Sequence, residues 1–100
     1  MKKILVVFSV LVFSHFIIAQ KTERVAFYNV ENLFDTINGP NSDEEFLPQG
    51  KKMWNLKKYE EKINHINKVI CELNTPMIIG LCEVENKGVL KDIIKEGKAL

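Results

Sequence analysis

The sequence predicts an α/β chain built around a strand–helix–strand unit. Residues 23–30 and 76–84 have the composition of strands, and residues 56–73 between them have the periodicity of an amphipathic helix. Two strands connected through a helix are typically parallel neighbours in one sheet. We therefore expect a right-handed βαβ unit in which both strands end at the same edge of the sheet.

Residues 1–20 have the pattern of a secretory signal peptide. Lys2 and Lys3 precede an apolar run over residues 4–13, and Ala19 places a small residue before polar Gln20. This pattern predicts cleavage after Ala19 and a secreted or periplasmic protein without a stable membrane anchor. An uncleaved anchor is the alternative, but the apolar stretch is short for a span of about 20 residues.

The charge of the chain gives no sign of a nucleic-acid partner. The sequence has 14 basic and 13 acidic side chains, and removal of Lys2 and Lys3 with the signal peptide leaves 12 against 13, a formal charge of −1. A protein that binds nucleic acid through phosphate contacts usually has a basic excess.

The first predicted strand, residues 23–30, is rich in β-branched and aromatic side chains. Val25, Phe27 and Asn29 share one face, so an asparagine lies in line with two apolar residues. If the extended conformation continues, Glu31 projects to the same side as Asn29.

Residues 31–55 are expected to be irregular, because turn signals occur at Asn38-Gly39-Pro40-Asn41 and at Pro48-Gln49-Gly50. Between these turns lies the acidic run Asp43-Glu44-Glu45. Its spacing is not that of a calcium-binding loop, which favours a solvated bend over a metal site.

The helix at residues 56–73 is predicted to begin after Asn55 as its N-cap and to end before Pro76. His65 has no carboxylate, Ser or Cys partner at a telling spacing and is expected at the surface. The predicted buried stripe of this helix consists of Tyr59, Ile63, Ile66, Ile70 and Leu73.

The second predicted strand, residues 76–84, is apolar on both faces, as in a central parallel strand. Such a strand needs cover on both sides and neighbours that the sequence does not contain. We therefore expect residues 21–100 to be the amino-terminal fragment of a longer domain. A further helix is predicted after Asn86 as N-cap, with Val89, Leu90, Ile93 and Ile94 as its buried stripe.

Cys71 falls in the predicted helix and Cys82 in the predicted buried strand. Burial as free thiols is favoured, because Cys is among the most often buried residue types. The sequence leaves open whether the two could form a disulfide.

Oxygen-bearing side chains stand at both predicted strand ends. Asn29 and Glu31 lie at the end of the first strand, and Glu83 lies at the end of the second. Mg²⁺ takes oxygen ligands and needs few protein carboxylates when a phosphate is also bound, so these residues are candidates for a metal and phosphate site. The alternatives are that Glu83 lies in solvent and that Asn29 bonds the adjoining loop. Asn32 and Glu85 are weaker candidates.

Several segments resemble the start of the endonuclease/exonuclease/phosphatase family, the superfamily of DNase I-like metal-dependent phosphoesterases. The resemblance spans about residues 23–96 and depends on the order and separation of its motifs. They are Phe27-Tyr28-Asn29-Val30-Glu31-Asn32-Leu33-Phe34-Asp35, Phe46-Leu47-Pro48, Trp54, Lys58-Tyr59, Lys62, and Ile78-Ile79-Gly80-Leu81-Cys82-Glu83-Val84-Glu85-Asn86.

This resemblance implies the amino-terminal portion of a four-layer α/β/β/α sandwich that is incomplete in this chain, and hydrolysis of phosphate esters with Mg²⁺ or Mn²⁺. It implies that Asn29 contacts the phosphate and orients the site, that Glu83 binds the metal, and that Glu31 helps to hold it. The family's water-activating His and Asp residues come from later motifs, which are absent here, so this fragment is expected to be inactive alone.

The substrate stays open among nucleic acid, a sugar or inositol phosphate and a phospholipid headgroup. A secreted non-catalytic binding protein that retains the sandwich is the alternative function, and an unrelated small structural domain is a third. The oligomeric state is also open.

Overall fold

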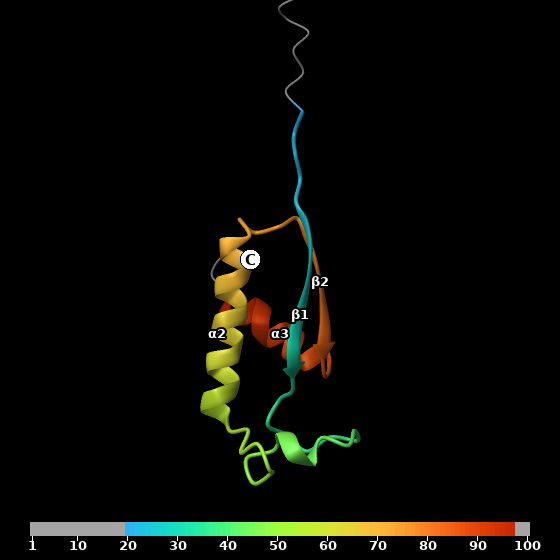
Figure 1. Cartoon of the computed structure of the whole chain (residues 1–100), viewed down its shortest axis with the longest axis vertical. Coiled ribbons are helices and arrows are strands. Elements are labelled where there is room, and N and C mark those ends of the chain that lie inside the picture. The colour runs from blue at the N-terminus through green and yellow to red at the C-terminus, as the bar shows by residue number, and fades with distance from the viewer. Residues whose placement is uncertain (1–19, 98–100) are drawn as a thin grey trace, which may run out of the picture.

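The computed structural model describes residues 20–97, so the predicted signal peptide lies almost wholly outside the described residues. The elements follow in the order β1 (Val25–Leu33), a 3-10 turn η2 (Glu44–Phe46), α2 (Leu56–Glu72), β2 (Ile78–Val84) and α3 (Lys87–Glu96). Figure 1 shows both helices on one side of the two strands. Within this part of the chain, no helix is long and apolar enough to cross a membrane.

The predicted parallel pairing of the strands is confirmed. Val25 pairs with Ile78, and the register continues without interruption to Asn29, which lies opposite Cys82. Both strands therefore point the same way and end beside the loop that leads to α2, as Figure 1 shows. The βαβ unit is present as a two-stranded sheet.

The end of β1 differs from the sequence prediction. The strand continues to Leu33, and the register shifts between Asn29 and Leu33. Glu31 has φ 55° and Asn32 has φ 59°, so both adopt the left-handed conformation. The condition under which Glu31 would share the side of Asn29, a continued extended conformation, is therefore not met, because the left-handed residues interrupt the extended chain.

Helix α2 follows the prediction closely. Asn55 caps it, since its side chain accepts a hydrogen bond from the Lys58 N–H. The helix ends at Glu72, one residue earlier than expected, so Leu73 is not part of the buried stripe and is 40% exposed. His65 is exposed, as predicted.

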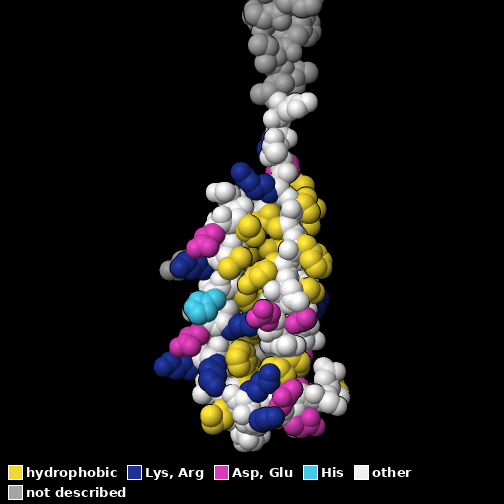
Figure 2. All heavy atoms as spheres, viewed as in Figure 1, with side chains coloured by type: hydrophobic (Ala, Val, Ile, Leu, Met, Phe, Trp, Pro, Cys, Tyr) yellow, Lys and Arg dark blue, Asp and Glu magenta, His cyan; other side chains and the backbone are white. Residues whose placement is uncertain are grey.

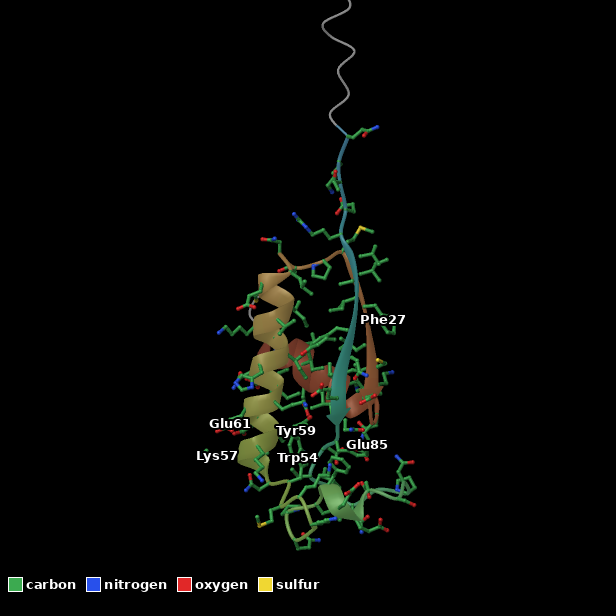
Figure 3. All side chains as sticks on the ribbon, viewed as in Figure 1. Phe27, Trp54, Lys57, Tyr59, Glu61 and Glu85 are labelled. Carbon is green, nitrogen blue, oxygen red and sulfur yellow. The ribbon has the colours of Figure 1, made fainter. Side chains whose placement is uncertain are left out.

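The core lies between the helices and the inner face of the sheet. Tyr59, the labelled core residue in Figure 3, points from α2 toward the strands. Helix α3 contributes less than expected, because Leu90 is 39% exposed and Ile94 is 61% exposed. The buried residues of the core are Val30, Leu33, Tyr59, Ile63, Ile66, Ile70, Val89 and Ile93.

The outer face of the sheet is apolar and exposed in this part of the chain. Phe27 is 78% exposed and points away from α2, as Figure 3 shows, and Val25 and Ile78 on the same face are 70% and 56% exposed. The Phe27 ring lies over Gly80 on the neighbouring strand, where an added Cβ would be 2.7 Å from the ring. β2 thus has cover on one face only.

Two further predictions need correction. Asp43 is not part of a solvated bend: it is 1% exposed and lies directly before η2, whereas Glu44 and Glu45 are exposed. Both cysteines are free, but only Cys82 is partly buried, and Cys71 lies exposed on α2. Asp43 is buried because the loop folds over it. Cys71 is exposed because the phase of α2 places it outside the buried stripe.

Candidate functional site

Asn29 and Glu83 meet at the carboxyl end of the sheet. The Asn29 Nδ2 donates a hydrogen bond of 2.8 Å to the Glu83 Oε1. The two residues are 54 positions apart in sequence, and the parallel register alone brings their strand ends together. The predicted juxtaposition of an amide and a carboxylate is therefore present.

The second oxygen of Glu83 is also held. The Asn32 N–H donates to the Glu83 Oε2 over 3.1 Å. This contact depends on the backbone, because the left-handed conformations of Asn32 and Glu83, with φ 59° and 61°, turn the chain away from straight strand geometry at both ends. Each carboxylate oxygen accepts one neutral donor and keeps a free lone pair.

Both the oxygen and the nitrogen of the Asn29 side-chain amide form hydrogen bonds. Its Oδ1 accepts a hydrogen bond of 2.8 Å from the Glu31 N–H, while its Nδ2 is engaged with Glu83. The side chain is therefore oriented by two partners and in turn orients the carboxylate. The Glu31 carboxylate is exposed nearby.

A hollow of about 560 Å³ opens at these strand ends. Figure 2 shows charged side chains of both signs gathered toward the lower end of this face, below the hydrophobic side chains of the strands. One wall comes from the loop before α2, where the Trp54 Nε1–H donates to the Phe34 carbonyl over 2.8 Å. The lining consists of Asn29, Glu31, Asn32, Phe46, Lys52, Trp54, Lys62 and Glu83.

Behind the hollow, Glu85 and Asn86 bind the loop to the end of β2. Glu85 Oε2 accepts from the Asp35 N–H over 2.9 Å, and Asn86 Nδ2 donates to Asp35 Oδ2 over 3.0 Å. Burial raises the pKa of the Glu85 carboxyl, and the charges of Asp35 and Asp43 raise it further, while the bond from the Asp35 N–H lowers it. Among the described residues, the buried Asp43 Oδ1 has no hydrogen-bond partner.

The oxygen donors at the strand ends fit a hard divalent cation. No three His, Cys, Asp or Glu side chains between residues 20 and 97 are grouped to hold a metal by themselves. Mg²⁺, however, is usually bound through one or two carboxylates, with water and phosphate oxygens completing its shell. The Glu83 carboxylate has free lone pairs and its hydrogen-bond partners are neutral, and within the described part of the chain it forms no ion pair with a lysine or arginine.

Sequence reasoning selected Asn29, Glu83 and Glu31 but missed the lysines of the hollow. Lys62 was named only as part of the family resemblance and was given no role, yet it is half-buried and its Nζ donates to the Glu31 carbonyl over 3.0 Å. The available signal was its position three residues after Tyr59, at the border of the buried stripe, where a lysine stem can lie along apolar surface. Nothing in the sequence indicated Lys52.

Comparison with known proteins gives one match. A family model described as the endonuclease/exonuclease/phosphatase family matches residues 24–100. No curated protein and no solved structure matches the chain. The matched span includes both strand ends and every residue that lines the hollow.

Proposed function

The chain belongs to the endonuclease/exonuclease/phosphatase family, whose members act on phosphate esters, and we propose that this protein hydrolyses a phosphate ester at the hollow beside Asn29 and Glu83. The observation that carries the proposal is the hydrogen bond between these two side chains, which presents a carboxylate and an amide together at the carboxyl ends of parallel strands. Ligands bind at this edge in open α/β sheets.

Glu83, helped by Glu31, would hold Mg²⁺ or Mn²⁺ in this site. When bound, such an ion supplies Lewis-acid stabilisation of the charge on the phosphoryl and leaving-group oxygens. Asn29 fits a positioning role better than that of a metal ligand, because its Oδ1 already accepts from the Glu31 N–H. It fixes the Glu83 carboxylate, and the Asn32 N–H completes that support.

The family resemblance implies that a His–Asp pair activates the attacking water, and the described part of the chain offers no such pair. His65 is exposed on α2, and within residues 20–97 no histidine is paired with a carboxylate. We therefore propose that residues 21–100 are an amino-terminal fragment of the catalytic domain and are inactive alone. A phosphodiesterase assay on this fragment tests the point, and metal-dependent turnover would contradict it.

The fold proposal follows from the bare outer face of the sheet. A second sheet packed on Val25, Phe27 and Ile78 would cover that face and build the four-layer α/β/β/α sandwich. Support comes from their exposure, since a strand apolar on both faces is normally covered on both. The signal peptide at residues 1–20 and export from the cytoplasm stay part of the proposal.

The function is tested with the natural full-length protein and simple phosphate mono- and diesters. We expect turnover with Mg²⁺ or Mn²⁺, loss of turnover after chelation, and recovery when the metal is restored. Turnover that is equal with and without chelator, in metal-free buffer, would contradict the proposed metal dependence. Absence of turnover with every ester class would contradict hydrolysis itself.

A further inference from the structure

Charges of opposite sign line the same hollow without forming ion pairs with one another. Glu31 and Glu83 are acidic, and Lys52 and Lys62 are basic. The ion pairs in the described part of the chain are Lys21–Glu23 and Lys68–Glu72, both elsewhere. Lysine and carboxylate groups that share a polar hollow normally attract each other, so their separation requires an explanation.

The Glu83 carboxylate and the Lys62 ammonium are each hydrogen-bonded to neutral groups. The Glu83 carboxylate is held by an amide and a backbone N–H, as described above. The Lys62 ammonium is held by the Glu31 carbonyl, which accepts one of its three N–H donors. Two donors of Lys62 therefore remain for a ligand, and its stem is half-buried.

Lys52 lies in the loop before α2, and an aromatic ring positions its ammonium group. Its Nζ lies 4.5 Å from the centroid of the Phe46 ring, a cation–π contact, and the Phe46 ring is itself stacked on Phe34 with a centroid separation of 4.2 Å. The Lys52 carbonyl accepts a hydrogen bond of 3.0 Å from Lys58 Nζ. The aromatic ring fixes the ammonium without neutralising its charge.

We propose that Lys62 and Lys52 form the anion-binding half of the site, and that its substrate carries a second phosphate near the phosphate that is hydrolysed. This inference rests on the proposed function. Lys62, anchored to the strand end that bears Asn29, binds the scissile phosphate. Lys52, anchored on the loop wall, binds the second phosphate, and a hollow of about 560 Å³ has room for more than one phosphate group.

Equilibrium binding of inorganic phosphate and of pyrophosphate to the full-length protein tests the assignment without any turnover. Lys62→Met should weaken the binding of both anions about tenfold, in line with a charged hydrogen bond. Lys62→Arg should stay within about threefold of the natural protein, because it keeps a cationic donor. Lys52→Met should weaken pyrophosphate about tenfold and leave phosphate nearly unchanged.

Lys57→Met is the matched control, because Lys57 is exposed on α2 and points away from the hollow in Figure 3. It should change neither affinity. A thermal melt of each variant shows that it is folded. Unchanged phosphate binding in folded Lys62→Met, or an equal effect of Lys52→Met on both anions, would overturn the assignment.

Turnover measurements then distinguish the possible sources of the two phosphates. One arm compares a dinucleotide with and without a terminal phosphate, and the other compares inositol mono- and bisphosphate. A lower KM for the doubly phosphorylated member of either pair, abolished by Lys52→Met, supports the assignment and identifies the substrate type. If pyrophosphate binding depends on Lys52 and Lys62 but no ester is hydrolysed, the assignment of the anion-binding residues is supported and the proposed hydrolysis is contradicted.

Discussion

At the scale of single residues, the Asn29 side chain links one backbone N–H and one acidic side chain. Its amide connects the Glu31 N–H to the Glu83 carboxylate. The sequence indicated this pair, because an asparagine within an apolar strand and a glutamate at a strand end are both unusual placements. The Asn32 N–H that completes the support of Glu83 could not be predicted, since its direction also depends on left-handed conformations at Glu31 and Glu83, and glutamate seldom adopts them.

Replacement of Glu83 by Gln should abolish most metal-dependent activity of the full-length protein. The change preserves the shape of the side chain but removes the charge that attracts a cation, and we expect a loss of about 100-fold or more in kcat. The Mg²⁺-induced rise in melting temperature should also disappear. Glu61→Gln is the control, because Glu61 points away from the site in Figure 3. Full activity of Glu83→Gln at saturating Mg²⁺ would contradict its assignment.

Tyr59 should make the protein sensitive to alkaline pH. Its hydroxyl donates a 2.6 Å hydrogen bond to Asp92 Oδ2, and burial, followed by this bond and the Asp92 charge, raises the pKa of Tyr59. The pKa of Tyr59 is raised in the folded state, so its contribution is complete below the unfolded pKa of about 10 and is lost as pH rises through the folded value.

Tyr59→Phe should therefore reduce the free energy of unfolding by about 1–3 kcal/mol near pH 7. The difference from the natural protein should shrink above about pH 10, because Tyr59 then ionises in the unfolded state while it stays protonated in the folded state. Denaturant unfolding at several pH values measures both effects. A difference that stays constant up to strongly alkaline pH would contradict this account.

At the scale of elements, the helices were more predictable than the strand ends. Helix α2 has a cap and a clear apolar stripe, and it ends within a few residues of Pro76, and all three are local signals. The bulged end of β1 and the loop that encloses Asp43 depend on contacts between residues distant in sequence, such as Trp54 with Phe34. The wall of the hollow was therefore not accessible from sequence patterns.

Asn86 is expected to stabilise both α3 and the loop. Its Oδ1 accepts from the Val89 N–H over 3.1 Å and its Nδ2 donates to Asp35. Asn86→Ala should reduce the free energy of unfolding by about 1–2 kcal/mol through loss of the cap. Asn64→Ala, at an exposed position within α2, should have almost no effect. Equal effects of the two changes on denaturant unfolding would contradict the capping role.

Gly50 should be essential to the loop wall. A Cβ added there would be 2.1 Å from the Glu44 carbonyl oxygen, so Gly50→Ala requires the backbone to move. We expect a loss of about 1–3 kcal/mol in stability and weaker binding of pyrophosphate, because Lys52 follows closely in the chain.

Gly39→Ala is the control for Gly50→Ala, because its Cβ would meet neighbouring side-chain oxygens only at ordinary contact distances of 3.6 and 3.8 Å. It should leave stability nearly unchanged. The prediction for Gly50 is wrong if both variants unfold at the same denaturant concentration.

At the scale of the whole molecule, the helices and the core lie on one side of the sheet only. The opposite face is formed by apolar residues that are largely exposed in the described part of the chain, among them Phe27 and Ile78. The sequence predicted the need for cover from the apolar character of β2, but a local pattern contains no information about which segment provides it.

In the full-length protein, Phe27→Ser should cost about 3–5 kcal/mol of stability, because the proposed second sheet would bury the ring. Ile37→Ser is the control: Ile37 has a similar exposure of 71%, against 78% for Phe27, but lies in the loop after β1 and is not part of the sheet. Denaturant unfolding compares the two. Small and equal effects would show that the outer face of the sheet remains in solvent.

The left-handed backbone at Glu31, Asn32 and Glu83 has a consequence for engineering. A side chain with a Cβ costs roughly 1–2 kcal/mol in this conformation, and glycine avoids most of that cost. A screen for heat resistance should therefore select glycine at Glu31 and Glu83, and each such gain would delete an acidic side chain of the site. At these positions a substitution that raises stability would remove a side chain that the proposed reaction needs.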